Sequence, residues 1–260
     1  MPTRSRYPDG VPCWVDLSAA DPATAKHFYT GLLGWEFEDM PNPGGGVYSM
    51  AHLRGHTVGA IGGHPPGVPD GTPSHWNTYL AAGDVAAATA RAVSAGGQVL
   101  MGPDDVGDAG RMAFLTDPTG AVIGLWESGQ HLGATLDKES GTLVWSELVT
   151  PEPETALAFY GSVVGMTHTA TPMPGGSYLV LHAGGEDIGG CTRPSLAQAP
   201  AHWQVYFAVD DPDIAAETAS TAGGSVLVAP FDVAGAGRIA VLADPTGGVF
   251  SVLRPDPTQR

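Results

Sequence analysis

The chain contains an internal duplication, which limits the folds it can adopt more than any other feature. Residues 14–35 (WVDLSAADPATAKHFYTGLLGW) and 145–166 (WSELVTPEPETALAFYGSVVGM) match at 8 of 22 positions with an offset of 131. Residues 110–127 and 237–254 match at 9 of 18 positions with an offset of 127. Two matches in the same order indicate two copies of one structural unit.

The spacing of these matches sets the domain boundaries. The offset falls from 131 to 127, so a loop in the second copy is four residues shorter. The stretch between the copies, residues 130–141, is polar and contains glycine, as is typical of a linker. We therefore expect one domain over residues 1–129 and a second over residues 142–260.

Each copy begins with a strand followed by a capped helix. In the first copy, residues 13–17 alternate in polarity, which predicts a strand with Trp14 and Asp16 on one face. Asp21 is a suitable N-cap, and Gly34 ends the helix at the C′ position. The helix carries an apolar stripe at helical spacing: Ala25, Phe28, Tyr29, Leu32 and Leu33.

The rest of the copy predicts short strands and one further helix. Strands are expected at 35–39, 47–53, 57–62, 75–81, 98–101, 111–116 and 121–126, and the second helix at 84–95. A Pro/Gly-rich break at 62–74 separates two β-α-β-β-β units. The whole chain is therefore expected to be α+β, with four βαβββ modules in two domains.

Two duplicated motifs connect this arrangement to a known family. They are FYTGLLGW (28–35) with FYGSVVGM (159–166), and DPTG before an apolar strand at 117–120 and 244–247. With the strand and helix order, they resemble the vicinal oxygen chelate superfamily of glyoxalases, bleomycin-resistance proteins and extradiol dioxygenases, in particular its tandem, hydroxylase-type members. The resemblance implies that the two modules of each half form one glyoxalase-like cup around a ligand cavity.

The resemblance also implies where a metal ion would bind. Metal-dependent members hold the ion with four His, Gln or Glu side chains on the first and last strands of each module. The corresponding positions here are Trp14, Ala60 or Gly62, Asn77 and Gly124 in the first half, and Trp145, a residue near Ile188, Gln204 and Ser251 in the second. Only Gln204 among these could serve, and one ligand does not hold a divalent ion. We therefore expect no bound metal ion. We also expect no flavin or nicotinamide cofactor, because no fingerprint for either is present.

The inward positions carry aromatic and polar side chains instead. We expect ligand-binding roles for Trp14, Asn77, Tyr79, Trp126, Trp145, Gln204 and Tyr206. Asp16 with His75, and Glu147 with His202, are predicted as catalytic pairs for proton transfer. A buried carboxylate needs a partner, which could be the histidine, Arg111 or Arg238, or a cationic group of the ligand. Each group also has a structural alternative: the tryptophans could pack in the core, the histidines could bond to the backbone, and the arginines could form structural salt bridges. Each carboxylate and histidine pair could also be part of a displaced metal site, but it offers two ligands where catalytic sites usually supply three.

Charge narrows the range of partners. Lys and Arg total 11 against 27 Asp and Glu, a formal net charge of −16. Such a chain repels nucleic acid and anionic membrane surfaces, whereas a cationic or neutral small molecule is not repelled. Two cysteines, Cys13 and Cys191, cannot form a disulfide framework, and no long apolar run appears, so we expect a cytoplasmic protein. Homodimerisation is left open.

Three functional hypotheses follow. In the first, the chain is a metal-independent enzyme, a hydroxylase, isomerase, hydrolase or lyase acting on a small aromatic, quinone-like or carbonyl metabolite. In the second, it is a binding protein that sequesters a cationic or aromatic antibiotic, as bleomycin-resistance proteins do. In the third, one half is active and the other is a structural partner. The sequence leaves open whether the chain is an enzyme.

Overall fold

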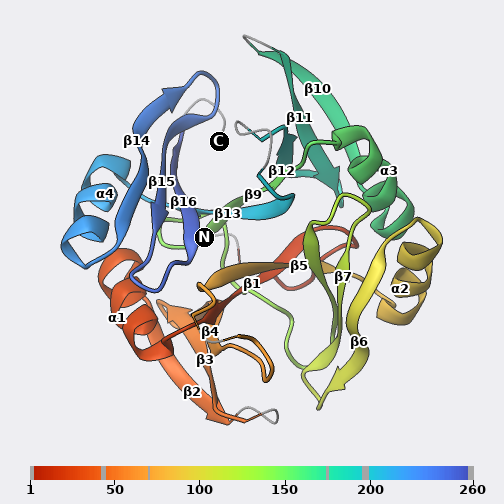
Figure 1. Cartoon of the computed structure of the whole chain (residues 1–260), viewed down its shortest axis with the longest axis horizontal. Helices are drawn as coiled ribbons and strands as arrows, with labels where there is room; N and C mark the ends of the chain where they lie inside the picture. Colours follow the sequence, from red (N-terminus) through yellow and green to blue (C-terminus); the bar gives the residue numbers. More distant parts are fainter. Residues whose placement is uncertain (1–2, 42–44, 70, 174–175, 195–198, 257–260) are drawn as a thin grey trace.

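The chain forms two curved eight-stranded sheets flanked by four helices (Figure 1). The computed structural model describes residues 3–41, 45–69, 71–173, 176–194 and 199–256. The first half contains β1 (Pro12–Ala19), α1 (Pro22–Leu33), β2 (Glu36–Pro41), β3 (Val47–Leu53), β4 (His56–Gly63), β5 (His75–Ala81), α2 (Val85–Ser94), β6 (Gln98–Val106), β7 (Gly110–Thr116) and β8 (Val122–Ser128). The second half repeats this order with β9 (Leu143–Val149), α3 (Pro153–Val164), β10 (Thr167–Met173), β11 (Gly176–Ala183), β12 (Glu186–Thr192), β13 (His202–Ala208), α4 (Pro212–Thr221), β14 (Ser225–Val233), β15 (Gly237–Ala243) and β16 (Val249–Pro255).

Each sheet is built from the two modules of one half. The strand orders are β2-β3-β4-β1-β5-β8-β7-β6 and β10-β11-β12-β9-β13-β16-β15-β14. The first strands of the two modules pair antiparallel at the centre, and each also pairs parallel with the last strand of its own module. The predicted α+β fold with four βαβββ modules in two cups is confirmed. The sheets curve away from each other and open at opposite ends of the molecule (Figure 1).

Local sequence sets the ends of the helices. The Asp21 carboxylate accepts hydrogen bonds from the backbone N–H groups of Ala23 and Thr24, both at 3.1 Å, so α1 begins where the sequence predicts. Pro22 occupies its first turn. Gly34 ends the helix with a φ of 73°, a left-handed conformation that favours glycine. Asp84 and Asp211 cap α2 and α4 in the same way.

The two halves share their cores. Helix α1 packs against α4 and α2 against α3, on the two flanks of the molecule (Figure 1). One buried cluster joins the second module of the first half to the first module of the second half, and another joins the remaining two modules. The halves are therefore stabilised largely by burying apolar surface of each other.

The duplicated motifs join the halves through buried hydrogen bonds. The Tyr29 hydroxyl donates to Asp244 Oδ2 at 2.9 Å, and the Tyr160 hydroxyl donates to Asp117 Oδ2 at 3.1 Å. Each tyrosine belongs to the helix motif of one half and each aspartate to the DPTG turn of the other. The other oxygen of Asp117, Oδ1, accepts from the backbone N–H groups of Thr119 and Ala121, which fixes the turn.

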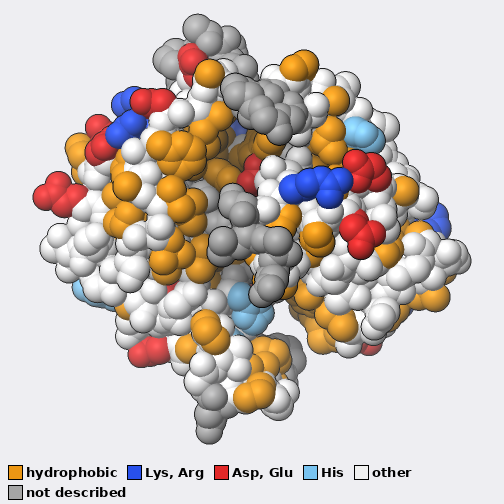
Figure 2. All heavy atoms as spheres, turned by 45° about the horizontal axis from the view of Figure 1, so that its top comes forward, with side chains coloured by type: hydrophobic (Ala, Val, Ile, Leu, Met, Phe, Trp, Pro, Cys, Tyr) orange, Lys and Arg blue, Asp and Glu red, His pale blue; other side chains and the backbone are white. Residues whose placement is uncertain are grey.

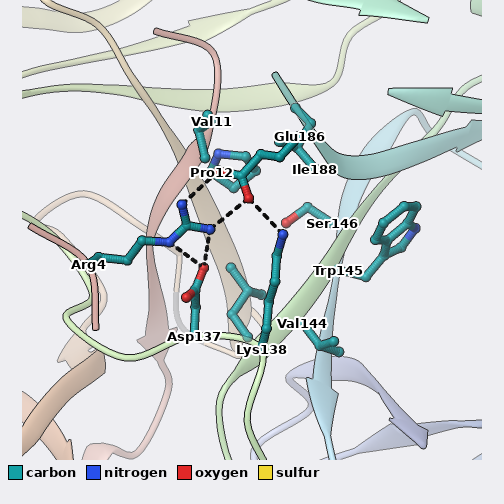
Figure 3. Close-up of a pocket in the computed structure, with 11 residues that line it drawn as sticks. Arg4, Val11, Pro12, Asp137, Lys138, Val144, Trp145, Ser146, Glu186 and Ile188 are labelled. Carbon is teal, nitrogen blue, oxygen red and sulfur yellow. Dashed lines mark hydrogen bonds and ion pairs between the residues drawn. The ribbon is translucent and has the colours of Figure 1, made fainter. Parts of the chain in front are cut away.

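The N-terminal segment and the linker form a third connection between the halves. Arg4 contacts both Asp137 of the linker, at 2.8 Å, and Glu186 of β12, at 2.7 Å, while Lys138 contacts Glu186 at 2.8 Å (Figure 3). We call these four residues the Arg4 ion cluster. The linker is packed more closely than its polar sequence suggests, since Leu136 is fully buried.

Candidate functional site

A hydrogen-bonded network lies on the concave face of the first cup. The Trp14 indole N–H donates to the Tyr48 hydroxyl at 2.9 Å, and this hydroxyl donates to Asp16 Oδ2 at 2.9 Å. The Tyr79 hydroxyl donates to the same oxygen at 2.8 Å, and the Asn77 side-chain amide donates to Oδ1 at 2.8 Å. Strand alternation places these groups together, because Asp16 pairs with Asn77 and Trp14 with Tyr79 across β1 and β5.

The second cup repeats this network. The Trp145 indole N–H donates to the Tyr178 hydroxyl at 2.9 Å, and this hydroxyl donates to Glu147 Oε1 at 2.7 Å. The Tyr206 hydroxyl donates to Oε2 at 2.9 Å. The amide of Gln204 donates instead to the Ser251 hydroxyl, at 3.2 Å. Each cup thus holds a tryptophan, two tyrosines and one carboxylate in the same connection, which we call the carboxylate network.

Burial changes the proton affinity of both carboxyl groups. Loss of solvation raises the pKa of Asp16 above its ordinary value, and the hydrogen bonds from Asn77, Tyr79 and Tyr48 oppose that rise. Burial raises the pKa of Glu147 in the same way, opposed by the hydrogen bonds from Tyr178 and Tyr206. Phenol hydroxyls stabilise a carboxylate without neutralising it. Each network therefore contains a buried carboxyl group with no cationic side chain hydrogen-bonded to it among the described residues.

The side chains present do not fit a divalent metal ion. Tyrosine rings fill the space over glycines at two of the expected ligand positions: the Tyr48 ring lies 3.2 Å from where a Cβ of Gly62 would be, and the Tyr79 ring would collide with a Cβ of Gly124. The oxygens of Asp16 already accept three hydrogen bonds. Within the described ranges, no group of three or more His, Cys, Asp or Glu side chains is placed to hold an ion.

The two predicted catalytic histidines lie at the ends of their strands. His75 is exposed and stacks on His64, with 5.8 Å between ring centroids. His202 is half-buried, and its Nδ1 lies 3.0 Å from the backbone carbonyl oxygen of Pro200. No hydrogen bond joins either ring to Asp16 or Glu147. The electrostatic effect of each imidazole lowers the pKa of its carboxyl group, by less than the hydrogen bonds do.

Trp126 lies on the concave face of its cup, whereas the two arginines predicted as possible partners of the carboxylates lie elsewhere. Trp126 lies in the first cup, where its indole N–H donates to the backbone carbonyl of His131 at 3.0 Å. Arg111 and Arg238 do not reach the carboxylate networks. Arg111 pairs with Asp105 at 2.9 Å, and Arg238 pairs with Asp213 at 2.6 Å on the helix-covered side of its sheet. The arginines therefore make the structural salt bridges that the sequence leaves as an alternative.

Sequence reasoning missed Tyr48 and Tyr178, which connect tryptophan to carboxylate. They lie on β3 and β11, two strands away from β1 and β9 in the sheets. The signal that could have found them is the duplication itself, because both are tyrosines at nearly the same offset as the network residues.

Comparison with protein families assigns both halves. The model described as "Glyoxalase/Bleomycin resistance protein/Dioxygenase superfamily" matches residues 13–125, and the model described as "Glyoxalase-like domain" matches residues 144–253. The chain is 54% identical over 261 residues to CFP32 of Mycobacterium tuberculosis, provisionally named a glyoxylase, with 100% of both chains covered. It is 36% identical to the anthracycline biosynthesis protein DnrV of Streptomyces peucetius, over 96% of this chain and 94% of that protein.

Solved structures share the fold at low sequence identity. The Mn(II)-bound glyoxalase of Novosphingobium aromaticivorans gives a TM-score of 0.66 at 17% identity, covering 95% of this chain and 82% of that one. The 2,3-dioxygenase LapB of Pseudomonas sp. KL28 gives 0.65 at 15% identity, covering 96% of both chains. These likenesses concern the arrangement of the strands and helices.

Proposed function

Because the chain belongs to the glyoxalase/bleomycin resistance protein/dioxygenase superfamily, we propose that it binds a small planar aromatic, quinone-like or carbonyl metabolite in a cup and exchanges a proton with it without a metal ion. The observation that carries this proposal is the carboxylate network, which is present in both halves with the same connections. Both copies retain these connections although residues 14–35 and 145–166 match at only 8 of 22 positions.

The network supports both parts of the proposal. The indole and phenol rings offer flat apolar surfaces on which an aromatic ligand can stack, a contact worth about 0.5–1.5 kcal/mol beyond the burial of area. Burial raises the pKa of each carboxyl group, which favours it as the group that takes a proton from a ligand or gives one to it. Isomerisation can proceed by such proton transfer alone, hydrolysis also consumes a water molecule, and hydroxylation also needs an oxidant.

The named relatives agree with an aromatic, quinone-like ligand. Two proteins related over 96% of this chain, DnrV and DauV, are named for anthracycline biosynthesis. Anthracyclines are planar quinones, and many carry an amino sugar whose ammonium group could approach a buried carboxylate.

A second candidate function is sequestration of a cationic aromatic antibiotic. The net charge of −16 and a carboxylate without a bonded cationic side chain among the described residues favour it. Long-range attraction would speed the capture of a cationic ligand, and this rate would fall as salt is added.

One titration separates the two functions. Daunorubicin and an uncharged hydroxyanthraquinone are added to the full chain with EDTA present, and tryptophan emission and the ligand's absorption spectrum are followed. We expect saturable quenching that EDTA does not change. A time-dependent change of the spectrum that is lost in Glu147→Gln indicates catalysis, and binding without such a change indicates sequestration. Binding or turnover that requires an added metal ion contradicts the proposal.

A further inference from the structure

The two cups differ in how far their own side chains fill them. A buried cluster lies on the concave face of the first cup and contains Trp14, Tyr79 and Trp126. Phe114 and Met112 pack against this cluster, and the Phe114 and Tyr79 rings are 5.1 Å apart. The two other buried clusters of the described residues join the halves, and neither occupies the concave face of the second cup.

The chain after β8 also covers the first cup. The His131 ring makes an edge contact with Trp14 at 4.5 Å between centroids and lies 5.6 Å from Trp126. The backbone N–H of Ala134 donates to the carbonyl of Cys13 at 2.8 Å, which holds this segment over the start of β1. All eight residues of β1 are buried, those on the helix side by the core and those on the concave side under this segment and the aromatic cluster.

The second cup has smaller side chains at the matching positions. The pairs, first half then second, are Met50 and Val180, Met112 and Ile239, Phe114 and Val241, and Trp126 and Leu253. At these four positions, two aromatic rings and two methionine side chains of the first cup correspond to shorter aliphatic groups on the concave face of the second. In β9, Trp145 and Glu147 are half-buried, although their counterparts on β1 are buried.

Both cups have an exposed apolar strand at one edge, β6 with Met101 at 39% exposure and β14 in the second cup, but Met101 is aligned with the Phe114 ring, and the row from β14 meets no such ring. Strand pairing aligns Val228 with Val241, Val241 with Ser251, and Ser251 with Tyr206, so this row ends at the carboxylate network. Val228 is 44% exposed and Phe231, further along β14, is 42% exposed. Hydrophobic side chains gather on the flank that carries β14 to β16 (Figure 2). An apolar ligand entering there would cover surface that is otherwise in contact with water.

From these differences we propose that the second half holds the ligand, and that the first cup is a closed structural copy filled by its own side chains. This inference rests on the proposed function and assigns its site. The ligand stacks on Trp145 and against the wall of β14 and β15, with a cationic or hydrogen-bond-donating group directed at Glu147. The closed cup retains the same network because it now contributes to the core of the first half.

The first test needs no ligand. Trp145 is the one half-buried tryptophan of the six, and the other five are buried. Acrylamide should quench a component of the emission that Trp145→Phe removes and Trp35→Phe retains. Quenching of equal extent in wild type and Trp145→Phe would overturn the assignment, whatever the ligand.

The second test uses daunorubicin with reciprocal substitutions. Val241→Phe gives the second cup the ring that fills the first, and Phe114→Val is the matched control, since it removes that ring from the first cup. Calorimetry should give one daunorubicin per chain, an affinity at least about tenfold weaker for Val241→Phe, and an affinity within about twofold of wild type for Phe114→Val. Glu147→Gln, which keeps the size of the side chain, should also weaken binding.

The outcomes separate the two proposals. Two ligands per chain, or weakening by Phe114→Val with none by Val241→Phe, would overturn the assignment to the second half while leaving the proposed function in place. If the wild-type chain binds neither daunorubicin nor the uncharged hydroxyanthraquinone, the proposed function is contradicted, and the assignment of its site is contradicted with it.

Discussion

The Arg4 ion cluster predicts a specific pH dependence of stability. Hydrogen bonds from Arg4, the largest cause, and from Lys138 lower the pKa of Glu186 from 4.5 to about 2. A carboxyl group with a lowered pKa binds its proton less readily in the folded state than in the unfolded state. Its stabilisation is therefore fully present above pH 4.5 and is lost as the pH falls towards about 2.

The size of the effect follows from this shift. At about 1.4 kcal/mol per pKa unit, the full shift from 4.5 to about 2 corresponds to roughly 3.5 kcal/mol. The side chain of Glu186 is 26% exposed, so water and salt screen the interaction, and we expect about 1–3 kcal/mol at low ionic strength. Glu186→Gln should lower the free energy of unfolding by this amount near neutral pH.

Urea unfolding of wild type and Glu186→Gln, followed by circular dichroism, measures this difference. It should shrink steadily as the pH is lowered from 4.5 towards 2, and it should also shrink in about 1 M NaCl. Glu217→Gln, at an exposed position on α4, is the matched control and should change the stability little at any pH. A difference between wild type and Glu186→Gln that stays constant across this pH range would refute the reasoning.

Three further results are expected. Tyr160→Phe removes the buried hydrogen bond to the Asp117 carboxyl group and leaves the Trp203 indole N–H without its acceptor, so it should cost about 1.5–3 kcal/mol of unfolding free energy in urea. An unchanged midpoint would contradict this role. Burial lowers the pKa of His131 to about 4, so an NMR titration should show its ring protonating near pH 4. Because the folded state favours the neutral ring, the free energy of unfolding should fall as the pH drops from 6.5 towards 4, and His131→Gln should abolish that part of the pH dependence. Gly124→Ala should lower the melting temperature by several degrees, because the new methyl group would displace the Tyr79 ring; an unaltered melting curve would mean that the ring moves freely.

Local sequence signals were sufficient for most of the fold. The strands 47–53 and 75–81 have the bounds predicted from alternation, and Asp21 and Gly34 end α1 as expected. These features depend on residues close together in the chain, so their geometry can be inferred without knowing the tertiary structure. The extra length of β6, which runs to Val106 instead of residue 101, results from its pairing with β7 and is not visible in its own residues.

The candidate site was predictable only in part. Alternation placed Trp14, Asp16, Asn77 and Tyr79 on one face, and the structure brings them into one network. Alternation predicts which face of a strand carries a residue, but not whether that residue lies near the buried middle of the strand or at its exposed end. For this reason the exposure of His75 could not be foreseen.

Among the described residues, no helix is both long enough and apolar enough to cross a membrane.

The reciprocal bonds from Tyr29 to Asp244 and from Tyr160 to Asp117 have a consequence for the history of the molecule. Each half supplies the partner that the other half needs, so a half excised as a separate polypeptide would regain its buried contacts by associating with a second copy of itself. The present chain therefore has the arrangement of a symmetric dimer whose two subunits are joined covalently. Joining two copies in one chain allows their sequences to diverge, so that one cup can be filled by its own side chains while the other can hold a ligand.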